Sequence, residues 1–305
     1  MTIALTGGTG FVGQRVLALA SGPVRALARK PQAERPGVAW VPGDLADEAA
    51  LARLCEGADA VVHVAGVVNA RNKAGFTAGN EAGTEAVLKA AQAAGTKRFV
   101  HVSSLAAREP GLSLYGASKA GAEALVSASP LDWVMVRPPA VYGPGDTEML
   151  DVYRLARRGL GLAPGSADAR ISILHADDLA RALLALAAAG PSRALLELDD
   201  GRGDAAGGYG HGEFARLIGA ALGNTVRTLP VPGAALAAAA GLATLAAGLS
   251  GKLPKLSRDR ARYIAHPDWV ARGGNAAISG IWQPQFDAAA GIADTVAGYR
   301  ASGWL

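Results

Sequence analysis

The sequence predicts an α/β protein built on a doubly wound parallel sheet, and three observations support this fold class. Short runs rich in β-branched residues alternate with longer Ala- and Leu-rich segments from the start of the chain. The short runs are apolar at nearly every position, which is typical of strands covered on both faces. The first run leads directly into a glycine-rich turn, as in sheets that bind ligands at the carboxyl ends of their strands.

The first half of the chain carries the clearest elements. We expect strands at residues 2–6, 24–28, 38–42, 60–65, 98–103 and 132–137, because β-branched and aromatic residues gather there. The intervening segments are longer and rich in helix-forming residues, and we expect helices at 11–20, 47–56, 77–94 and 115–128.

The alternation weakens after about residue 144. We expect loops over 143–150 and 159–170, a strand followed by a helix over 171–188, and a glycine-rich loop over 202–212. The predicted domains are therefore residues 1–145, with segments around 170–200 returning to the sheet, and residues 146–305, which form mostly a smaller C-terminal cap for substrate.

Composition narrows the class of protein. The 305 residues are 50% hydrophobic and 18% charged, which predicts a compact globular chain rather than a disordered one. The single cysteine, Cys55, cannot form an internal disulfide, and no secretory signal pattern opens the sequence, so we expect a cytoplasmic protein. The net charge is +4, but the basic residues are scattered and few aromatic residues accompany them, which argues against nucleic-acid binding.

One segment, residues 231–249, raises the question of a membrane because it is long and uncharged. It consists mostly of Ala and Gly, which contribute little transfer free energy per residue. A packed or lid-forming helix is the favoured interpretation, and contact with a membrane surface is the weaker alternative.

The turn after the first strand has the spacing of a dinucleotide-binding loop. Gly8, Gly10 and Gly13 satisfy G-x-G-x-x-G, and the sequence from Thr6 satisfies the related T-G-x-x-G-x-x-G. Glycine lets the backbone turn tightly and approach a pyrophosphate, which the N-terminus of the next helix attracts. This favours a Rossmann-type sheet, and the expected cofactor contacts here are Gly7, Thr9, Gly10, Phe11, Val12 and Gly13.

The end of the second strand predicts which dinucleotide binds. An acid there would accept a hydrogen bond from the adenosine 2′-hydroxyl, but the strand ends in Ala28, Arg29 and Lys30. A guanidinium can bind a 2′-phosphate through two hydrogen bonds. We therefore expect Arg29 and Lys30 to favour NADP, with NAD as the alternative.

Tyr115 and Lys119 stand four residues apart in an expected helix. That spacing places both side chains on one helix face, about 6 Å apart along the axis. An exposed Tyr and Lys at this spacing are common on solvated helices, so the pair alone does not establish a site.

The motifs in this order resemble a known family, the extended short-chain dehydrogenases/reductases, in its epimerase/dehydratase-like and 3β-hydroxysteroid-dehydrogenase-like branch. The resemblance covers roughly residues 1–180. It rests on "TGGTGFVG", "GDL" (43–45), "HVAG" (63–66), "NEAGT" (80–84), "HVSS" (101–104), "YGASK" (115–119) and "RPPAVYGPGD" (137–146).

The resemblance implies roles for the candidate catalytic residues. Tyr115 is expected to be the general acid/base, and Lys119 to lower the pKa of that phenol, ordinarily near 10, and to bind the nicotinamide ribose. Ser104, chosen over Ser103, is expected to orient the substrate oxygen, and Asn80 to help hold Lys119 or to cap its helix. The remaining cofactor contacts that the resemblance implies are Asp44, Leu45, Ala65, Gly66, Pro138 and Val141.

The expected function is that of an NADP(H)-dependent oxidoreductase that transfers hydride at a carbonyl or secondary alcohol of a small molecule. The alternatives are a nucleotide-sugar epimerase or dehydratase, which the sequence "RPPAVYG" disfavours, and a non-catalytic NADP-binding subunit or sensor. A homodimer would fit the family. No metal site is expected, because the five histidines form no i, i+4 pair and have no neighbouring cysteine.

Overall fold

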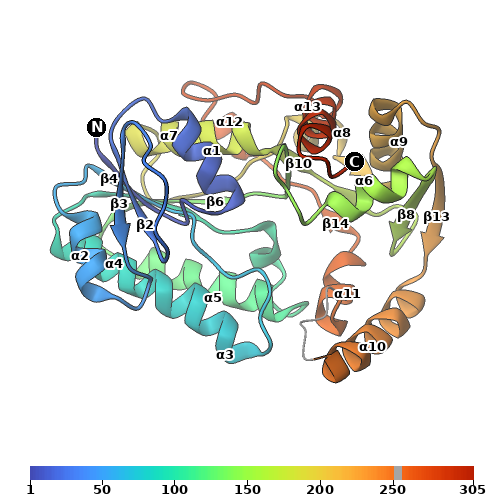
Figure 1. Cartoon of the computed structure of the whole chain (residues 1–305), viewed down its shortest axis with the longest axis horizontal. Helices are drawn as coiled ribbons and strands as arrows, with labels where there is room; N and C mark the ends of the chain where they lie inside the picture. Colours follow the sequence, from blue (N-terminus) through green and yellow to red (C-terminus); the bar gives the residue numbers. More distant parts are fainter. Residues whose placement is uncertain (251–255) are drawn as a thin grey trace. The chain divides into compact units, whose positions relative to one another are not determined.

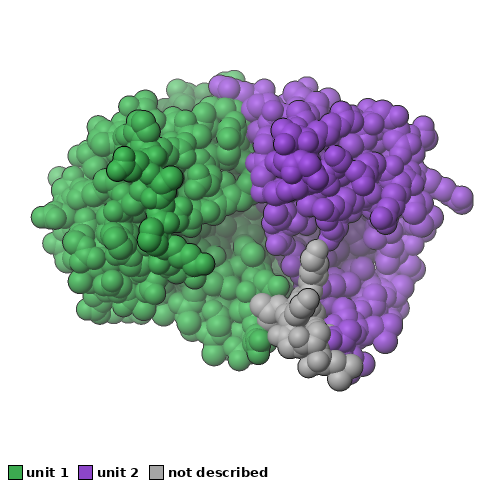
Figure 2. All heavy atoms as spheres, viewed as in Figure 1, with its two compact units in different colours: residues 1–138, 176–197, 273–283 green, residues 139–175, 198–272, 284–305 purple. Residues whose placement is uncertain are grey.

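The computed structural model describes residues 1–250 and 256–305, and these form two compact units (Figure 2). Unit 1 comprises residues 1–138, 176–197 and 273–283, and unit 2 comprises residues 139–175, 198–272 and 284–305. The chain thus leaves unit 1 after Pro138, before the expected boundary at 145, and returns to it a second time at 273–283.

Unit 1 contains a seven-stranded parallel sheet in the order β11-β6-β5-β4-β1-β2-β3 (Figure 1). The expected doubly wound parallel sheet is confirmed. From β1 the chain builds β2 and β3 on one side and β4, β5 and β6 on the other, so the carboxyl ends of β1 and β4 lie at the point where the strand order reverses. The strands are β1 (Ile3–Thr6), β2 (Val24–Ala28), β3 (Val38–Pro42), β4 (Ala60–His63), β5 (Arg98–Val102), β6 (Asp132–Arg137) and β11 (Ala194–Glu197).

Helices cover both faces of this sheet. Helices α1 and α7 pack together on one face, and α2, α4 and α5 lie on the other (Figure 1). Leu51 and Leu54 of α2 and Val87 of α4 are fully buried in the core beneath them. The helices of unit 1 are α1 (Phe11–Leu19), α2 (Glu48–Cys55), α3 (Lys73–Phe76), α4 (Gly83–Ala93), α5 (Leu114–Ala128), α7 (Ala176–Ala188) and α12 (Gly274–Ala277), with the 3₁₀-helix η2 (Leu105–Arg108).

Residues 77–94, predicted as one regular helix, form the π-helix η1 (Thr77–Ala82) followed by α4. Two glycines of this stretch pack closely against other segments. A Cβ on Gly79 would collide with the side chain of Val67, and a Cβ on Gly83 would lie 2.7 Å from Leu45. Apolar periodicity does not distinguish a short π-helical turn from a regular helix.

Unit 2 is built from short strands and helices around a core of its own that includes Tyr142, Tyr153 and Phe214. Its strands pair as β7 (Ala140–Tyr142) with β10 (Ile173–His175), β8 (Leu160–Pro164) with β13 (Arg227–Val231), and β9 (Arg170–Ile171) with both β12 (Tyr209–Gly210) and β14 (Asp268–Trp269). Its helices are α6 (Leu150–Arg157), α8 (Arg202–Ala206), α9 (His211–Leu222), α10 (Gly233–Ser250), α11 (Arg258–Ile264) and α13 (Ala288–Ala301).

The prediction of loops is wrong for two segments of unit 2. Residues 160–164 form strand β8, although they contain no β-branched residue, because they pair along their whole length with β13. Residues 202–212, predicted as a glycine-rich loop, contain α8, β12 and the start of α9. Asp199 stabilises the start of α8, since its carboxylate accepts hydrogen bonds from the backbone N–H groups of Gly201 and Gly203.

Candidate active site

The glycine turn after β1 has the shape of a pyrophosphate cradle. Gly7 has φ +75°, and a Cβ on it would lie 2.7 Å from the backbone nitrogen of Ala65. A Cβ on Gly13 would collide with the carbonyl of Gly7, whose oxygen accepts a hydrogen bond of 3.0 Å from the N–H of Gly10. Gly10 begins α1 without a side-chain cap, so the first N–H groups of the helix are directed at the turn. These residues fit a dinucleotide.

The other predicted contacts of this turn lie around the N-terminus of α1. Thr9 is exposed, and Phe11 and Val12 are half-buried in the first helical turn. Arg29 and Lys30 are both exposed directly after β2. A further cation, Arg35, donates a hydrogen bond of 3.2 Å to the Gln14 side chain on α1.

A chain of hydrogen bonds fixes the loop that follows β4. The N–H of Ala65 donates to Thr6 Oγ1 (3.3 Å), and Thr6 Oγ1 lies 2.6 Å from His63 Nδ1. His63 Nε2 lies 3.0 Å from Thr84 Oγ1, which donates to the carbonyl of Asn80 (2.6 Å). Because Thr84 uses its proton on Asn80, His63 is assigned the tautomer with the proton on Nε2.

His63 is neutral in this chain. Burial, and to a smaller extent the positive charge of Lys119, lowers the pKa of His63 to about 3. The ring of His101 stacks on that of His63 with centroids 5.3 Å apart, and burial likewise holds the pKa of His101 well below its ordinary value. The chain from Ala65 to Asn80 is therefore uncharged at every step.

Asn80 ties the loop after β4 to α5. Its Oδ1 accepts a hydrogen bond of 2.6 Å from the N–H of Val67, and its Nδ2 donates to the carbonyl of Val67 (3.0 Å). The same Nδ2 donates to Ser118 Oγ (2.8 Å), and Ser118 in turn donates to the carbonyl of Tyr115. Asn80 is 2% exposed, so its polar atoms depend on these partners. The side chain positions a loop and does not cap a helix.

Helix α5 carries the predicted tyrosine and lysine. Ser113 caps its first turn by accepting a hydrogen bond from the N–H of Gly116 (3.0 Å). Tyr115 is half-buried, with its ring 6.3 Å from that of Phe76. Lys119 is 4% exposed and donates from Nζ to the carbonyl of Val102 (2.6 Å).

The charge of Lys119 is held in a desolvated setting. Burial lowers the pKa of Lys119 to about 8, against the opposing attraction of Glu123. Gly66 of this loop packs closely against the pair, since a Cβ on Gly66 would lie 3.8 Å from Lys119 Nζ and 3.0 Å from Asn80 Oδ1. Asn80, Lys119 and Gly66 are thus neighbours, although 53 positions separate Gly66 from Lys119 in the sequence.

The two serines after β5 have different partners. Ser104 Oγ accepts a hydrogen bond from the N–H of Ala106 (3.2 Å) at the start of η2. Ser103 Oγ instead donates to Glu123 Oε1 (2.5 Å) and is buried with it. Only Ser104 therefore keeps its hydroxyl proton without a partner among the described residues.

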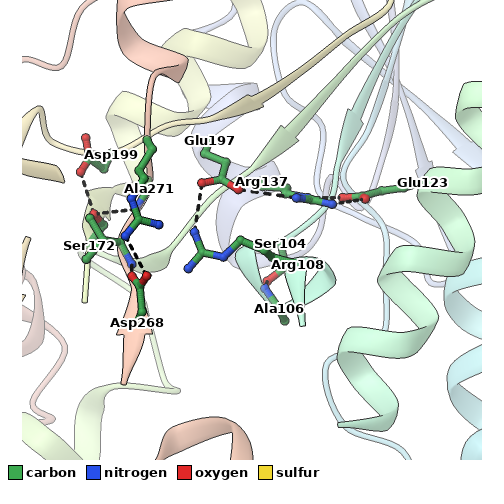
Figure 3. Close-up of polar contacts among 12 residues, drawn as sticks. Ser104, Ala106, Arg108, Glu123, Arg137, Ser172, Glu197, Asp199, Asp268 and Ala271 are labelled. Carbon is green, nitrogen blue, oxygen red and sulfur yellow. Dashed lines mark hydrogen bonds and ion pairs between the residues drawn. The ribbon is translucent and has the colours of Figure 1, made fainter. Parts of the chain in front are cut away.

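An ionic chain of four side chains lies beside these serines (Figure 3). Glu123 of α5 binds Arg137 of β6 through two hydrogen bonds of 2.8 and 2.7 Å. Glu197 of β11 lies 3.5 Å from Arg137 and 3.3 Å from Arg108 of η2. The hydrogen bonds and charge of Glu123 raise the pKa of Arg137, so the guanidinium keeps its positive charge.

Sequence reasoning did not identify Ser118, Glu123 or Arg137 as parts of the site. Ser118 and Glu123 lie three residues after Tyr115 and four after Lys119, spacings that place them on the same side of a helix. That spacing could have revealed both. No local sequence pattern could have predicted the ion pair between Glu123 and Arg137, because Glu123 lies on α5 and Arg137 lies on the strand that follows it.

The remaining predicted contacts are more scattered. Asp44 is exposed, and its carboxylate accepts a hydrogen bond from the N–H of Ala46 (2.8 Å). Leu45 packs against the core near α4, and Pro138 is buried with its carbonyl bonded to the N–H of Leu105 (3.0 Å). Val141 is half-buried on β7 and belongs to unit 2, unlike the other predicted residues. In the described part of the chain, no group of three or more His, Cys, Asp and Glu side chains could hold a metal ion.

The sequence of this chain is similar to those of a known protein family and of several characterised reductases. A family model described as NAD(P)H-binding matches residues 7–187. The ceramide reductase of Caulobacter vibrioides is 38% identical over 310 residues, covering 99% of this chain and 96% of the relative. The 2-alkyl-3-oxoalkanoate reductase of Stenotrophomonas maltophilia is 32% identical and covers 64% of this chain and 68% of the relative.

Among solved structures, a human epimerase family protein with NADPH has the same fold. It superposes with a TM-score of 0.75 at 22% identity, over 97% of this chain and 99% of that one.

Proposed function

The chain belongs to the NAD(P)H-binding family and to the extended short-chain dehydrogenase/reductase superfamily, and from that premise we propose that this NAD(P)-dependent oxidoreductase uses NADP(H) to reduce a ketone flanked by long alkyl chains. The observation that carries the proposal is the placement of Tyr115 and Lys119 on one face of α5, with Lys119 and Asn80 packed closely around Gly66 of the loop after β4. The substrate class rests on the ceramide and 2-alkyl-3-oxoalkanoate reductases, whose names both indicate substrates with alkyl chains.

The catalytic roles follow from the chemistry of each side chain. NADPH, when bound, supplies the hydride that reduces the carbonyl carbon. The Tyr115 hydroxyl donates a proton to the carbonyl oxygen, and the Lys119 ammonium stabilises the phenolate left behind. Ser104 orients the same oxygen, because its acceptor position is used by Ala106 while its proton is available.

The turn and loops of unit 1 would hold the cofactor. Gly7, Gly10 and Gly13 would hold the pyrophosphate with Thr9, Phe11 and Val12, and Arg29 and Lys30 would bind the 2′-phosphate. Asp44 and Leu45 would lie near adenine. The nicotinamide half would contact Ala65, Gly66, Pro138, Val141, Tyr115 and Lys119.

A second candidate is an epimerase, favoured by the fold likeness to a human epimerase family protein. The two candidates differ in their redox balance. A reductase consumes one NADPH for each alcohol formed, whereas an epimerase returns the hydride within each cycle. We expect the absorbance of NADPH to fall in step with the alcohol when a long-chain 3-oxo amide is supplied. No reduction of this ketone, together with inversion of a secondary alcohol at constant NADPH, would support the epimerase.

The cofactor preference has a separate test. Arg29→Ala should weaken NADPH binding about 10- to 100-fold, as expected for losing charge-assisted hydrogen bonds, and leave NADH binding nearly unchanged. Titration calorimetry measures both affinities. Arg53→Ala, which removes another exposed arginine of unit 1 on α2, serves as the matched control. Equal loss of NADPH and NADH affinity in Arg29→Ala would overturn the phosphate assignment.

A further inference from the structure

Helix α10 contains no charged residue, and its residues 233–246 are mostly exposed. Its 18 residues, Gly233–Ser250, contain no charged side chain, and Ala240 is the one fully buried residue between 233 and 246. Leu242 and Leu245, three residues apart on one face, are each 70% exposed. A helix that is apolar on all sides is normally buried, so this exposure requires a partner.

Exposed leucines also lie on the two-stranded sheet formed by β8 and β13, and β13 precedes α10 in the chain. Leu229 of β13 lies directly opposite Leu162 of β8, and these side chains are 39% and 49% exposed. Only Pro232 lies between the end of β13 at Val231 and the start of α10 at Gly233. The exposed leucines therefore lie on the consecutive elements β13 and α10 and on β8, the strand that pairs with β13.

Helix α11, which packs against α10, adds positive charge (Figure 1). Arg258 and Arg262 are exposed one helical turn apart, and neither forms an ion pair within the described residues. A Cβ on Gly241 of α10 would lie 3.6 Å from the Arg258 guanidinium, so that cation lies close against the apolar helix. Arg260 is bound to Glu148 at 2.7 Å, and Asp259 accepts a hydrogen bond from Ser257.

We propose that α10, α11 and the Leu162–Leu229 pair form a docking surface for an anionic lipid bilayer. No helix among the described residues is long and apolar enough to cross a membrane. Instead, α10 lies in the plane of the bilayer surface with Leu242 and Leu245 among the acyl chains, and Arg258 and Arg262 bind lipid phosphates. An apolar helix bordered by unpaired arginines matches an anionic membrane better than an apolar protein partner, which would leave those charges desolvated.

The test uses the full chain and vesicles of phosphatidylcholine, with or without phosphatidylglycerol. We expect sedimentation with the phosphatidylglycerol vesicles and weaker binding at high salt. Leu242→Glu with Leu245→Glu should lower the partition coefficient at least about tenfold, because two carboxylates would enter an apolar and anionic layer. Arg258→Gln and Arg262→Gln should each lower it roughly fivefold.

The matched control adds the same two carboxylates elsewhere. Leu195→Glu with Ile281→Glu changes residues of unit 1 that are 41% and 40% exposed, and this variant should bind vesicles like the wild type. Circular dichroism and NADPH binding verify that each variant folds. Failure of the wild type to bind anionic vesicles, or full binding by the α10 double variant, would overturn the proposal. So would a lipid-free dimer that this variant converts to monomers, since the surface would then join two copies of the chain.

Discussion

Two helices, α5 in unit 1 and α10 in unit 2, begin in similarly Ala-rich sequence but depart from ordinary burial in opposite directions. Helix α5 buries Lys119 and Glu123, which are 4% and 8% exposed, whereas α10 exposes Leu242 and Leu245. A buried charge costs desolvation free energy, and an exposed leucine forgoes the hydrophobic effect. We interpret each departure as the mark of a proposed function: the buried charges of α5 as chemistry inside the protein, and the exposed leucines of α10 as a partner outside it.

The largest effect should come from α5. Tyr115→Phe removes the proton donor while keeping the ring, so we expect turnover to fall by about 10³-fold or more and the dissociation constant of NADPH to stay nearly unchanged. Steady-state kinetics and a fluorescence titration measure the two quantities. If Tyr115→Phe kept the turnover of the wild type, Tyr115 would not be the proton donor, and the buried charges of α5 would no longer indicate an active site.

Lys119→Met should separate activity from stability. Turnover should fall by about 100-fold, while the free energy of unfolding near neutral pH should rise by up to about 3 kcal/mol, because a buried charge is removed. The pKa of Lys119 is about 8 in the folded protein and 10.5 ordinarily. Between these values the unfolded chain binds the additional proton, so wild-type stability rises with pH and the advantage of the variant shrinks.

Urea unfolding on both sides of the folded-state pKa of Lys119 measures this dependence. Lys89→Met is the control, because Lys89 is an exposed lysine of the same unit. A variant that is less stable than the wild type at neutral pH would show that the buried ammonium contributes more through its hydrogen bond to Val102 than burial costs.

A smaller effect is expected from the uncharged chain that positions Asn80. Thr84→Val leaves His63 Nε2 and the carbonyl of Asn80 without their partner, so stability should fall by about 1–3 kcal/mol. Turnover should fall about tenfold through looser positioning, with no shift of its pH profile because no charge changes. A shifted profile would mean that this chain also acts electrostatically. Thr96→Val, at a buried threonine outside the chain, is the control.

The smallest effect on chemistry should come from α10. Leu242→Glu with Leu245→Glu should leave the kcat for a water-soluble short-chain ketone unchanged, because neither side chain belongs to the proposed site. The same variant should slow reduction of a ketone embedded in anionic vesicles. If the variant lost activity equally on both substrates, α10 would affect the reaction itself and not membrane binding alone.

Much of unit 1 could be predicted from the sequence because each of its strands is marked locally. The run from Ile3 to Thr6 is wholly buried, and the glycines after it are required by contacts of their own backbone. Family resemblance then assigned Tyr115 and Lys119, whose shared helix face follows from their spacing alone.

The rest depended on contacts between distant residues. Strand β8 has no propensity signal of its own and exists through its pairing with β13. The π-helical turn around Asn80 includes Gly79 and is followed by Gly83, and both glycines pack against distant residues, Val67 and Leu45. The ionic chain from Glu123 to Arg108 joins four elements, and a one-dimensional pattern cannot show such an arrangement.

The central claim is that a ketone is reduced by NADPH beside Tyr115 and Lys119 of α5. The most direct measurement follows deuterium from NADPH labelled at nicotinamide C4 into the alcohol formed from a long-chain 3-oxo amide, using the wild type and Tyr115→Phe. The account predicts one deuterium on the carbinol carbon in the wild type and almost no labelled alcohol from the variant. An alcohol without deuterium, or equal labelling by both proteins, would contradict it.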